Sequence, residues 1–263
     1  MTDSPIHDTG KRPSKARVRQ SFERAAASYD SAADVQRRIC SRLAAELPAT
    51  PTPARLLDAG CGTGYARALL QARFPDADYV ALDLSSGMLA RIAAPCRRIA
   101  GDLEPLPLGN ASIDLYWSSL AVQWCELAKA LAEACRILRP GGRVALASLG
   151  PETFHELRAA FAGVDDYRHT LAFHSPAEIR QIATSAGLLA VAVHQHTEIA
   201  HYPDFRSLLK AVKAIGANQV GSGRRTSLMS RSDFSRAEAA FETRRTPAGL
   251  PLTYDVLTLS AQT

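Results

Sequence analysis

The strongest candidate for chemistry is a glycine-rich run that follows a short apolar segment. Residues 56–64 read Leu-Leu-Asp-Ala-Gly-Cys-Gly-Thr-Gly. Glycine lets the backbone adopt positive φ angles and approach a ligand closely. The carboxylate of Asp58 would repel a pyrophosphate but attract a cation. The run therefore predicts a site at Gly60, Gly62 and Gly64 for a ligand that carries positive charge.

Polar residues also end the next two apolar segments. Asp83 ends residues 79–83, and its carboxylate could accept hydrogen bonds from the hydroxyls of a ribose. Asp102 follows residues 97–100 and could accept the exocyclic amine of an adenine, with Leu103 packed against the ring. The two acids together predict a nucleoside site.

A fourth apolar segment, residues 113–117, ends at Ser118 and Ser119. Ligands of open parallel sheets bind at the carboxyl ends of the strands. Each of these polar residues alone could be a turn residue or a helix cap. Their succession at four strand ends is harder to explain that way, so it favours one binding edge.

The elements that must position these residues alternate between strands and helices. Short apolar segments are separated by stretches whose apolar residues recur at helical spacing. Such alternation predicts an α/β fold with a parallel sheet that helices cover on both faces. The expected strands are residues 55–58, 79–83, 97–100, 113–117, 144–147, 188–193 and 252–259.

The chain divides at proline-rich positions. Residues 1–13 are polar and predict a disordered tail. Residues 14–48 carry apolar residues at helical spacing and predict an N-terminal helical cap, which a cluster of prolines ends. Residues 49–263 then form the main domain, with a helical insertion at about 200–248 before the last strand.

Composition excludes several classes of protein. The 263 residues are 46% hydrophobic, which is too apolar for an intrinsically disordered chain. No uncharged apolar run is long enough to span a membrane. Five cysteines without a C-x-x-C spacing, after a polar N-terminus, favour the cytoplasm over a disulfide framework or a zinc site. The net charge of +5 is mild and selects no partner by itself.

The order of the motifs resembles the class I S-adenosylmethionine-dependent methyltransferases over roughly residues 50–150. The resemblance implies a Rossmann-like, mostly parallel sheet of seven strands. It also implies S-adenosylmethionine as cofactor, whose sulfonium charge suits the acidic glycine loop. The cofactor-binding residues implied are Asp58, Gly60, Gly62, Gly64, Asp83, Leu84, Asp102, Leu103 and Ser118.

Further segments resemble the malonyl-acyl-carrier-protein O-methyltransferases of biotin synthesis. This resemblance covers nearly the whole chain after residue 15 and implies methyl transfer to the free carboxylate of malonyl-acyl-carrier protein. The Ala-Val-Gln-Trp-Cys sequence is its most distinctive part. The segments that carry it are residues 22–30, 117–125, 202–204, 213–217 and 251–254.

The implied reaction needs no general base, because a carboxylate is already ionised at neutral pH. It requires instead that the oxygen be held in line with the methyl–sulfur bond and that water be excluded. The resemblance points to Tyr29 as a hydrogen-bond donor beside the carboxylate. The family usually carries an arginine where this chain has Lys210, so Lys210, or Arg206 one turn earlier, is expected to bind the carboxylate.

The implied partner is an acidic acyl carrier protein that carries malonyl, with neither nucleic acid nor membrane involved. Basic residues of the insertion could steer its docking. Two alternatives stay open: a methyltransferase acting on another small carboxylic acid or a quinone, and an S-adenosylmethionine-binding assembly factor of a respiratory complex. The basic residues concerned are Arg206, Lys210, Lys213, Arg224 and Arg225.

Overall fold

The computed structural model describes residues 12–214 and 229–263. Its centre is a seven-stranded sheet in the order β3-β2-β1-β4-β5-β7-β6. The first five strands are parallel, and β7 pairs antiparallel with both β5 and β6. The strands are β1 Arg55–Ala59, β2 Asp78–Asp83, β3 Arg97–Ala100, β4 Ile113–Ser119, β5 Leu138–Leu149, β6 Leu189–Tyr202 and β7 Leu250–Gln262.

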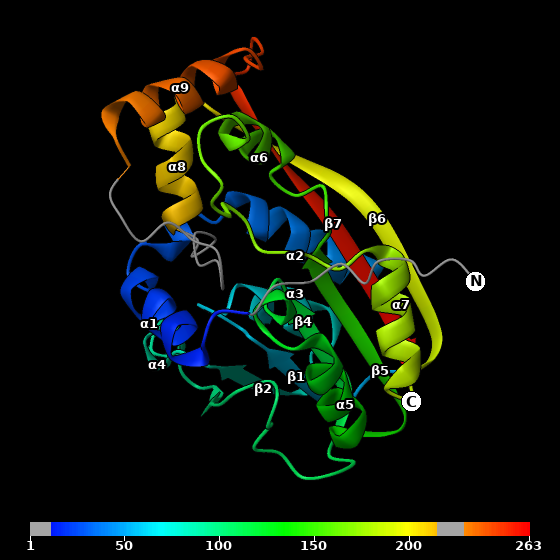
Figure 1. Cartoon of the computed structure of the whole chain (residues 1–263). Coiled ribbons are helices and arrows are strands. Elements are labelled where there is room, and N and C mark those ends of the chain that lie inside the picture. The colour runs from blue at the N-terminus through cyan, green and yellow to red at the C-terminus, as the bar shows by residue number, and fades with distance from the viewer. Residues whose placement is uncertain (1–11, 215–228) are drawn as a thin grey trace, which may run out of the picture.

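Helices cover both faces of this sheet. In Figure 1, α5 and α7 lie in front of the sheet, while α2 and α3 lie behind it. At one end, α6, α8 and α9 form a group above β7 (Figure 1). The helices are α1 Lys15–Ala25, α2 Asp34–Glu46, α3 Tyr65–Arg73, α4 Ser86–Leu89, α5 Leu127–Ile137, α6 His155–Phe161, α7 Pro176–Ser185, α8 Phe205–Ala214 and α9 Arg231–Glu242.

Alternating side chains of the central strands build two separate cores. Within β1, Leu56 packs into the core that α2 and α3 share, and Leu57 packs into the core that α5 and α7 share. Both side chains are fully buried. A strand buried on both faces reads as a continuous apolar run, which is the pattern seen in the sequence. The predicted class I methyltransferase architecture is confirmed.

Several element boundaries differ from those expected. The strand expected at 188–193 continues to Tyr202, because β6 pairs with β7 along its whole length. Its second half contains His194, Gln195 and His196, so the apolar pattern that marks a strand stops at Val193. An edge strand with one face in solvent need not be apolar. The helical part of the insertion therefore begins at α8.

The N-terminal residues pack against the main domain. The predicted cap consists of α1, a short 3₁₀ turn at Tyr29–Ser31, and α2. Pro13 is buried, and the guanidinium of Arg12 donates to the carbonyl oxygen of Ala172 at 2.8 Å. The expected tail at residues 1–13 thus ends in contact with the fold, and its first eleven residues lie outside the described part.

The helices that the structure describes include none that is long and apolar enough to cross a membrane. The glycine-containing segment expected as a loop near residues 221–223 lies outside the described residues. The same is true of Arg224 and Arg225, which were expected to contribute to a basic surface.

Candidate active site

The glycine loop connects the carboxyl end of β1 to α3. Gly60 has a φ of +78°, and a Cβ there would lie only 2.2 Å from the Cβ of Ala121. Gly62 has a φ of +55°, and a Cβ there would meet no atom within 4 Å. The first glycine is therefore required by close packing. The second leaves open space at the end of the sheet, where a ligand can approach the backbone.

Asp58 precedes this loop as a buried carboxyl group, with only 2% of its surface exposed. The hydroxyl of Tyr79 donates to its Oδ2 at 2.5 Å. Burial, together with the nearby Asp83 carboxylate, raises the pKa of Asp58 to about 7. The protein therefore stabilises the ionised form of Asp58 only in part. A cation bound beside it would stabilise this ionised form.

Asp83 ends β2 and lies across the same loop. Its Oδ2 accepts from the backbone N–H of Gly62 at 2.8 Å, and its Oδ1 accepts from that of Ser85 at 2.8 Å. A carboxylate offers about four lone-pair positions, so the backbone bonds leave room for a ligand to donate to it. The two backbone bonds fix the orientation of the carboxylate toward the cavity beside it.

That cavity, here named the cap cavity, lies between α1 and the carboxyl ends of the strands. It measures about 80 Å³ and is enclosed on one side by Val18 and Phe22 of α1. The structure brings six of the predicted cofactor-binding residues to its wall. They are Gly60, Gly62, Asp83, Leu84, Asp102 and Leu103.

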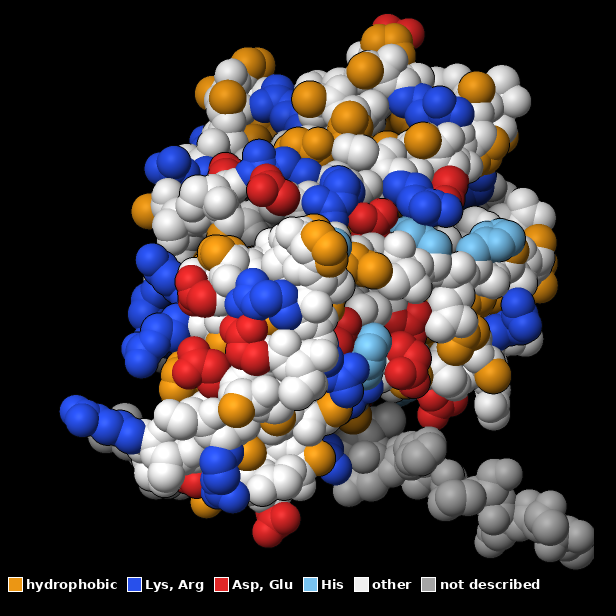
Figure 2. All heavy atoms as spheres, turned by 90° about the horizontal axis from the view of Figure 1, so that it is seen from above, with side chains coloured by type: hydrophobic (Ala, Val, Ile, Leu, Met, Phe, Trp, Pro, Cys, Tyr) orange, Lys and Arg blue, Asp and Glu red, His pale blue; other side chains and the backbone are white. Residues whose placement is uncertain are grey.

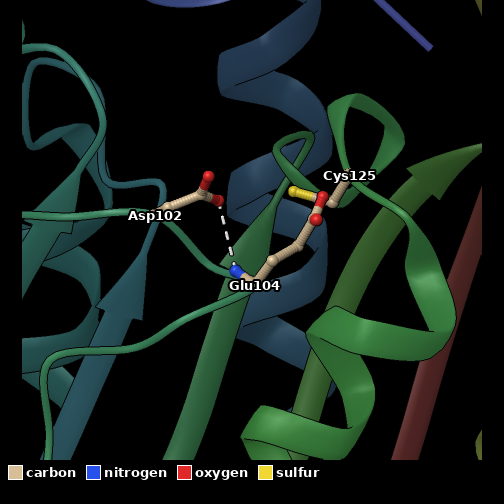
Figure 3. A group of neighbouring side chains, drawn as sticks. All are labelled: Asp102, Glu104 and Cys125. Atoms are coloured by element: carbon tan, nitrogen blue, oxygen red, sulfur yellow. Dashed lines mark hydrogen bonds between the residues drawn. The ribbon is translucent and has the colours of Figure 1, made fainter. Parts of the chain in front are cut away.

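One end of the cap cavity holds a cluster of acidic groups and a thiol. Figure 3 shows Asp102, Glu104 and Cys125 together, with the backbone N–H of Glu104 donating to Asp102. The ammonium of Lys15 lies 3.0 Å from Asp102 Oδ1, 2.7 Å from Glu104 Oε1 and 3.2 Å from Cys125 Sγ. The ammonium therefore occupies the place between three groups whose ligand atoms lie close enough together to hold a metal ion.

The cap also contacts the glycine loop and α4. The Thr63 hydroxyl donates to Asp30 Oδ1 at 2.7 Å, and the backbone N–H of Gly87 donates to Glu23 Oε2 at 2.9 Å. With the Lys15 cluster, these contacts hold the cap over the cavity at three places. Lys15 was not among the residues expected from the sequence, because nothing in its local pattern indicates a partner more than eighty residues away.

Tyr29 connects the cap cavity to two others. The loop cavity surrounds the glycine loop and includes Asp58, Gln36 and Thr63 in its wall. The inner cavity lies on the other side, between the cap and the segment after β5. Tyr29 lines all three cavities. Burial and the neighbouring carboxylates, Asp83 first, raise the pKa of Tyr29, so its hydroxyl stays protonated and can donate at neutral pH.

The inner cavity is walled by apolar and neutral polar side chains, with no lysine or arginine among the described residues that line it. Gln123 lines it with 8% of its surface exposed. Trp124 packs edge-to-face on Phe22, with ring centroids 5.8 Å apart. Both residues belong to the Ala-Val-Gln-Trp-Cys segment singled out in the sequence. The complete wall is Phe22, Tyr29, Gln36, Leu120, Gln123, Trp124, Leu149, Phe154, Thr170, Leu171, Phe173 and Tyr254.

Two predicted cofactor-binding residues do not reach these cavities. The hydroxyl of Ser118 is fully buried and donates to the carbonyl of Ala59 at 2.8 Å, which ties β4 to β1. Ser119 lines the cap and loop cavities instead. Gly64 takes a φ of +87° at the start of α3, and a Cβ there would lie 2.9 Å from Ile92. Ser118 and Gly64 therefore stabilise the fold and do not line the cavities.

The two predicted carboxylate-binding residues also lie away from the cavities around Tyr29. Arg206 and Lys210 are exposed on α8, and the Arg206 guanidinium lies over the Phe234 ring at 4.9 Å. Figure 2 looks down on this end of the molecule and shows basic side chains spread across it, with acidic ones between them. Sequence spacing placed both residues on one helix correctly, but it could not show which way the helix faces.

The fold and the acidic glycine-loop site define a class I S-adenosylmethionine-dependent methyltransferase. A family model described as a methyltransferase domain matches residues 57–146. The fold is similar to that of a SAM-dependent methyltransferase from Thermotoga maritima, with a TM-score of 0.56 over 92% of this chain and 98% of the other, at 17% identity.

Similarity to two named proteins identifies the family within this class. The malonyl-[acyl-carrier protein] O-methyltransferase of Dechloromonas aromatica (strain RCB) is 71% identical over 262 residues, covering 100% of both chains. The enzyme of the same name from Laribacter hongkongensis (strain HLHK9) is 40% identical, covering 92% of this chain and 87% of its own. The chain belongs to the malonyl-[acyl-carrier protein] O-methyltransferase family.

The residues present fit the cofactor of this class. Asp58 and Asp83 face connected cavities, and neither forms an ion pair within residues 12–214 and 229–263. Carboxyl groups withdrawn from water need a cation or a proton. The sulfonium and ammonium groups of S-adenosylmethionine supply such charge, and the space beside Gly62 admits it.

Proposed function

We propose that this protein transfers a methyl group from S-adenosylmethionine to the free carboxylate of malonyl-acyl-carrier protein, giving the methyl ester used in biotin synthesis. The observation that carries the proposal is the position of Tyr29. Tyr29 lines both the acidic cofactor cavities and the neutral inner cavity. The names of the relatives, over the full length of the chain, support the same substrate.

The chain's own residues have three tasks in this reaction. Asp58, Asp83 and the glycine loop bind and orient the methyl donor, which when bound supplies a methyl group from a positively charged sulfur. Tyr29 donates a hydrogen bond that holds the acceptor oxygen in place. Phe22 and Trp124 exclude water from the junction. No proton needs to be removed, since the malonyl carboxylate is already ionised.

The neutral wall of the inner cavity suits a carboxylate that loses its charge as it is methylated. An arginine bound to the carboxylate would stabilise the charged reactant and weaken its nucleophilicity. Neutral donors such as Tyr29 orient the oxygen but stabilise the charged reactant less, so they raise the reaction barrier less. This gives a physical reason why Arg206 and Lys210 are not needed at the reacting atoms. We propose that they act at the surface, in docking.

The proposal also covers the protein partner and the cellular compartment. We propose an acidic carrier protein as partner, since basic side chains are spread over the end that carries α8 and α9 (Figure 2). We also propose the cytoplasm as compartment. The five free cysteines, three of them buried, fit a reducing environment.

The test is mass spectrometry of malonyl-acyl-carrier protein incubated with the enzyme and S-adenosylmethionine. The acyl group should gain one methylene unit, and fragmentation of the acyl group should place the gain on its carboxyl oxygen. Acetyl-acyl-carrier protein, which lacks the free carboxylate, is the matched control and should gain nothing. Absence of the gain, with the cofactor shown to bind, would contradict the proposed substrate.

A further inference from the structure

A second, roomier cavity adjoins the inner cavity and has no part in the site described so far. This outer cavity measures about 570 Å³ and lies along the segment that joins α6 to α7. Its volume is in the range of small-molecule sites. Thr170, Leu171 and Phe173 line both the outer and the inner cavity. The inner cavity measures only about 30 Å³, and one short stretch of chain separates it from the outer cavity, so this stretch must shift for the two cavities to join.

The wall of the outer cavity contains two arginines and two acids, so its formal charges balance, and these groups differ in the partners that they bind. The Arg158 guanidinium donates to backbone carbonyls, including that of Pro151 at 2.7 Å, and forms no ion pair within the described residues. Arg168 is exposed and forms no hydrogen bond or ion pair within that same part of the chain. Asp165 is engaged by His169 at 2.8 Å. Glu178 is engaged by the Ser175 cap.

Gln123 lines the inner cavity and has a buried polar atom that needs a partner. The Nε2 of Gln123 donates to the carbonyl of Leu120 at 2.7 Å, which fixes the orientation of the amide. Its Oε1 is buried and has no hydrogen-bond partner within the described residues. A buried acceptor without a partner is costly and is usually satisfied by a ligand or water. An N–H donor of a bound substrate would satisfy this oxygen.

We propose that the outer and inner cavities form one passage for the phosphopantetheine arm of the carrier protein, an inference that rests on the proposed function. Such an arm carries a phosphate at its base, amide groups along its length and the acyl thioester at its tip. The passage presents the same order of complementary groups. Arg168 meets the phosphate, Gln123 accepts from an amide N–H, and Tyr29 meets the carboxylate.

The charge at the outer end is tested with Arg168→Ala and three malonyl thioesters. These are malonyl-carrier protein, malonyl-phosphopantetheine and malonyl-N-acetylcysteamine, the last of which lacks the phosphate. We expect the KM for the first two to rise about fivefold, the usual scale of one exposed charge-assisted contact, with the third unchanged. Arg180→Ala, on α7 and outside the cavity wall, is the matched control and should change none of them.

The path itself is tested by obstruction. Ala162 lines the outer cavity and is exposed, so Ala162→Trp should narrow the passage without disturbing the core. We expect kcat/KM to fall about tenfold or more for carrier-bound malonyl and by less than twofold for the short thioester. Ala159→Trp, on the exposed face of α6 and outside the wall, is the matched control.

The amide contact is tested by a double cycle. Malonyl-N-acetylcysteamine is compared with the ethyl thioester of malonate, which lacks the amide, on the native enzyme and on Gln123→Met. The native enzyme should favour the amide-containing acceptor about fivefold in KM, and the preference should vanish in the variant. A preference that survives in the variant would remove Gln123 from the passage.

The outcomes separate the two proposals. If the native enzyme methylates carrier-bound malonyl but Arg168→Ala and Ala162→Trp behave like their controls, the passage is wrong and the function stands. Equal losses toward all three thioesters would also overturn the passage. If no malonyl thioester is methylated by the native enzyme, the proposed function itself fails.

Discussion

The cavities on the two sides of Tyr29 differ in the charge of their walls and in volume. The cofactor side is lined by carboxyl groups and enclosed by the cap, and its cap cavity measures only about 80 Å³. The acceptor side consists of a neutral inner cavity of about 30 Å³ and an adjoining outer cavity of about 570 Å³, whose wall holds two arginines and two acids. The contrast suits a cationic ligand on one side and a ligand held by neutral groups on the other, with Tyr29 between them. Because the cap cavity and the inner cavity are both small, both must widen to admit their ligands.

The largest effect is expected from removing Asp83, which we propose binds the ribose of the cofactor. Asp83→Ala should weaken S-adenosylmethionine binding about a hundredfold, because hydrogen bonds from two hydroxyls to one charged group would be lost. Isothermal titration calorimetry measures the change. Asp78→Ala, at the opposite end of β2, is the control and should leave the dissociation constant within about twofold. Equal weakening in both variants would mean general damage to the strand.

Tyr29→Phe tests the junction between the two sides. It should lower kcat about tenfold to a hundredfold, the range for losing one hydrogen bond to a charged group, and change cofactor affinity less than threefold. Steady-state kinetics with malonyl-carrier protein, together with calorimetry, separate the two readouts. Unchanged kcat would remove Tyr29 from the reacting centre and leave it as a packing residue.

The acidic side should also respond to pH. The pKa of Asp58 is about 7, and the ionised form binds the cationic cofactor better. Affinity should therefore be full above this pKa and fall as the pH drops through it, becoming about tenfold weaker at pH 6 than at pH 8. Asp58→Asn should remove most of this dependence. A variant that retains the full slope would assign it to another group.

In the protein without cofactor, Asp58 should make stability depend on pH in the opposite direction. A carboxyl group whose pKa is raised by folding binds a proton more tightly in the folded state. The contribution is full below the unfolded pKa of 3.8 and is lost as the pH rises toward 7. The free energy of unfolding of native protein without cofactor should therefore fall over this range relative to Asp58→Asn, as thermal melts at matched ionic strength would measure.

How much the sequence could predict depended on whether a residue acts through its neighbours in the chain. The alternation of strands and helices and the glycine loop follow local patterns, so Gly60, Asp83 and Asp102 were expected at the carboxyl ends of their strands, and the structure places all three in the wall of the cap cavity. Lys15 acts through a contact with Asp102, and no spacing rule links positions so far apart. Ser118 and Ser119 occupy adjacent positions, and which one faces the cavity depends on the pleat of β4.

The closure of the cofactor side should depend on Lys15. Lys15→Met keeps most of the side-chain length but removes the ammonium that joins α1 to Asp102 and Glu104. We expect the cofactor to dissociate about fivefold faster, since part of what holds the cap closed is lost. Stopped-flow fluorescence of Trp124, which lines the cavity, measures the rate. Arg19→Met, exposed on the same helix, is the control.

The smallest effect is expected at the surface, where the acceptor side would meet its carrier protein. Replacing Arg206 and Lys210 together by alanine should raise the KM for malonyl-carrier protein about threefold at low salt and leave kcat unchanged, because exposed charges steer encounter but do not touch the reacting atoms. The difference should disappear at high salt, where the charges are screened. A large loss of kcat that persists at high salt would mean that α8 carries a residue of the site itself, and it would restore the expectation drawn from the sequence. Such a result would also require α8 to turn toward Tyr29 when the carrier protein binds.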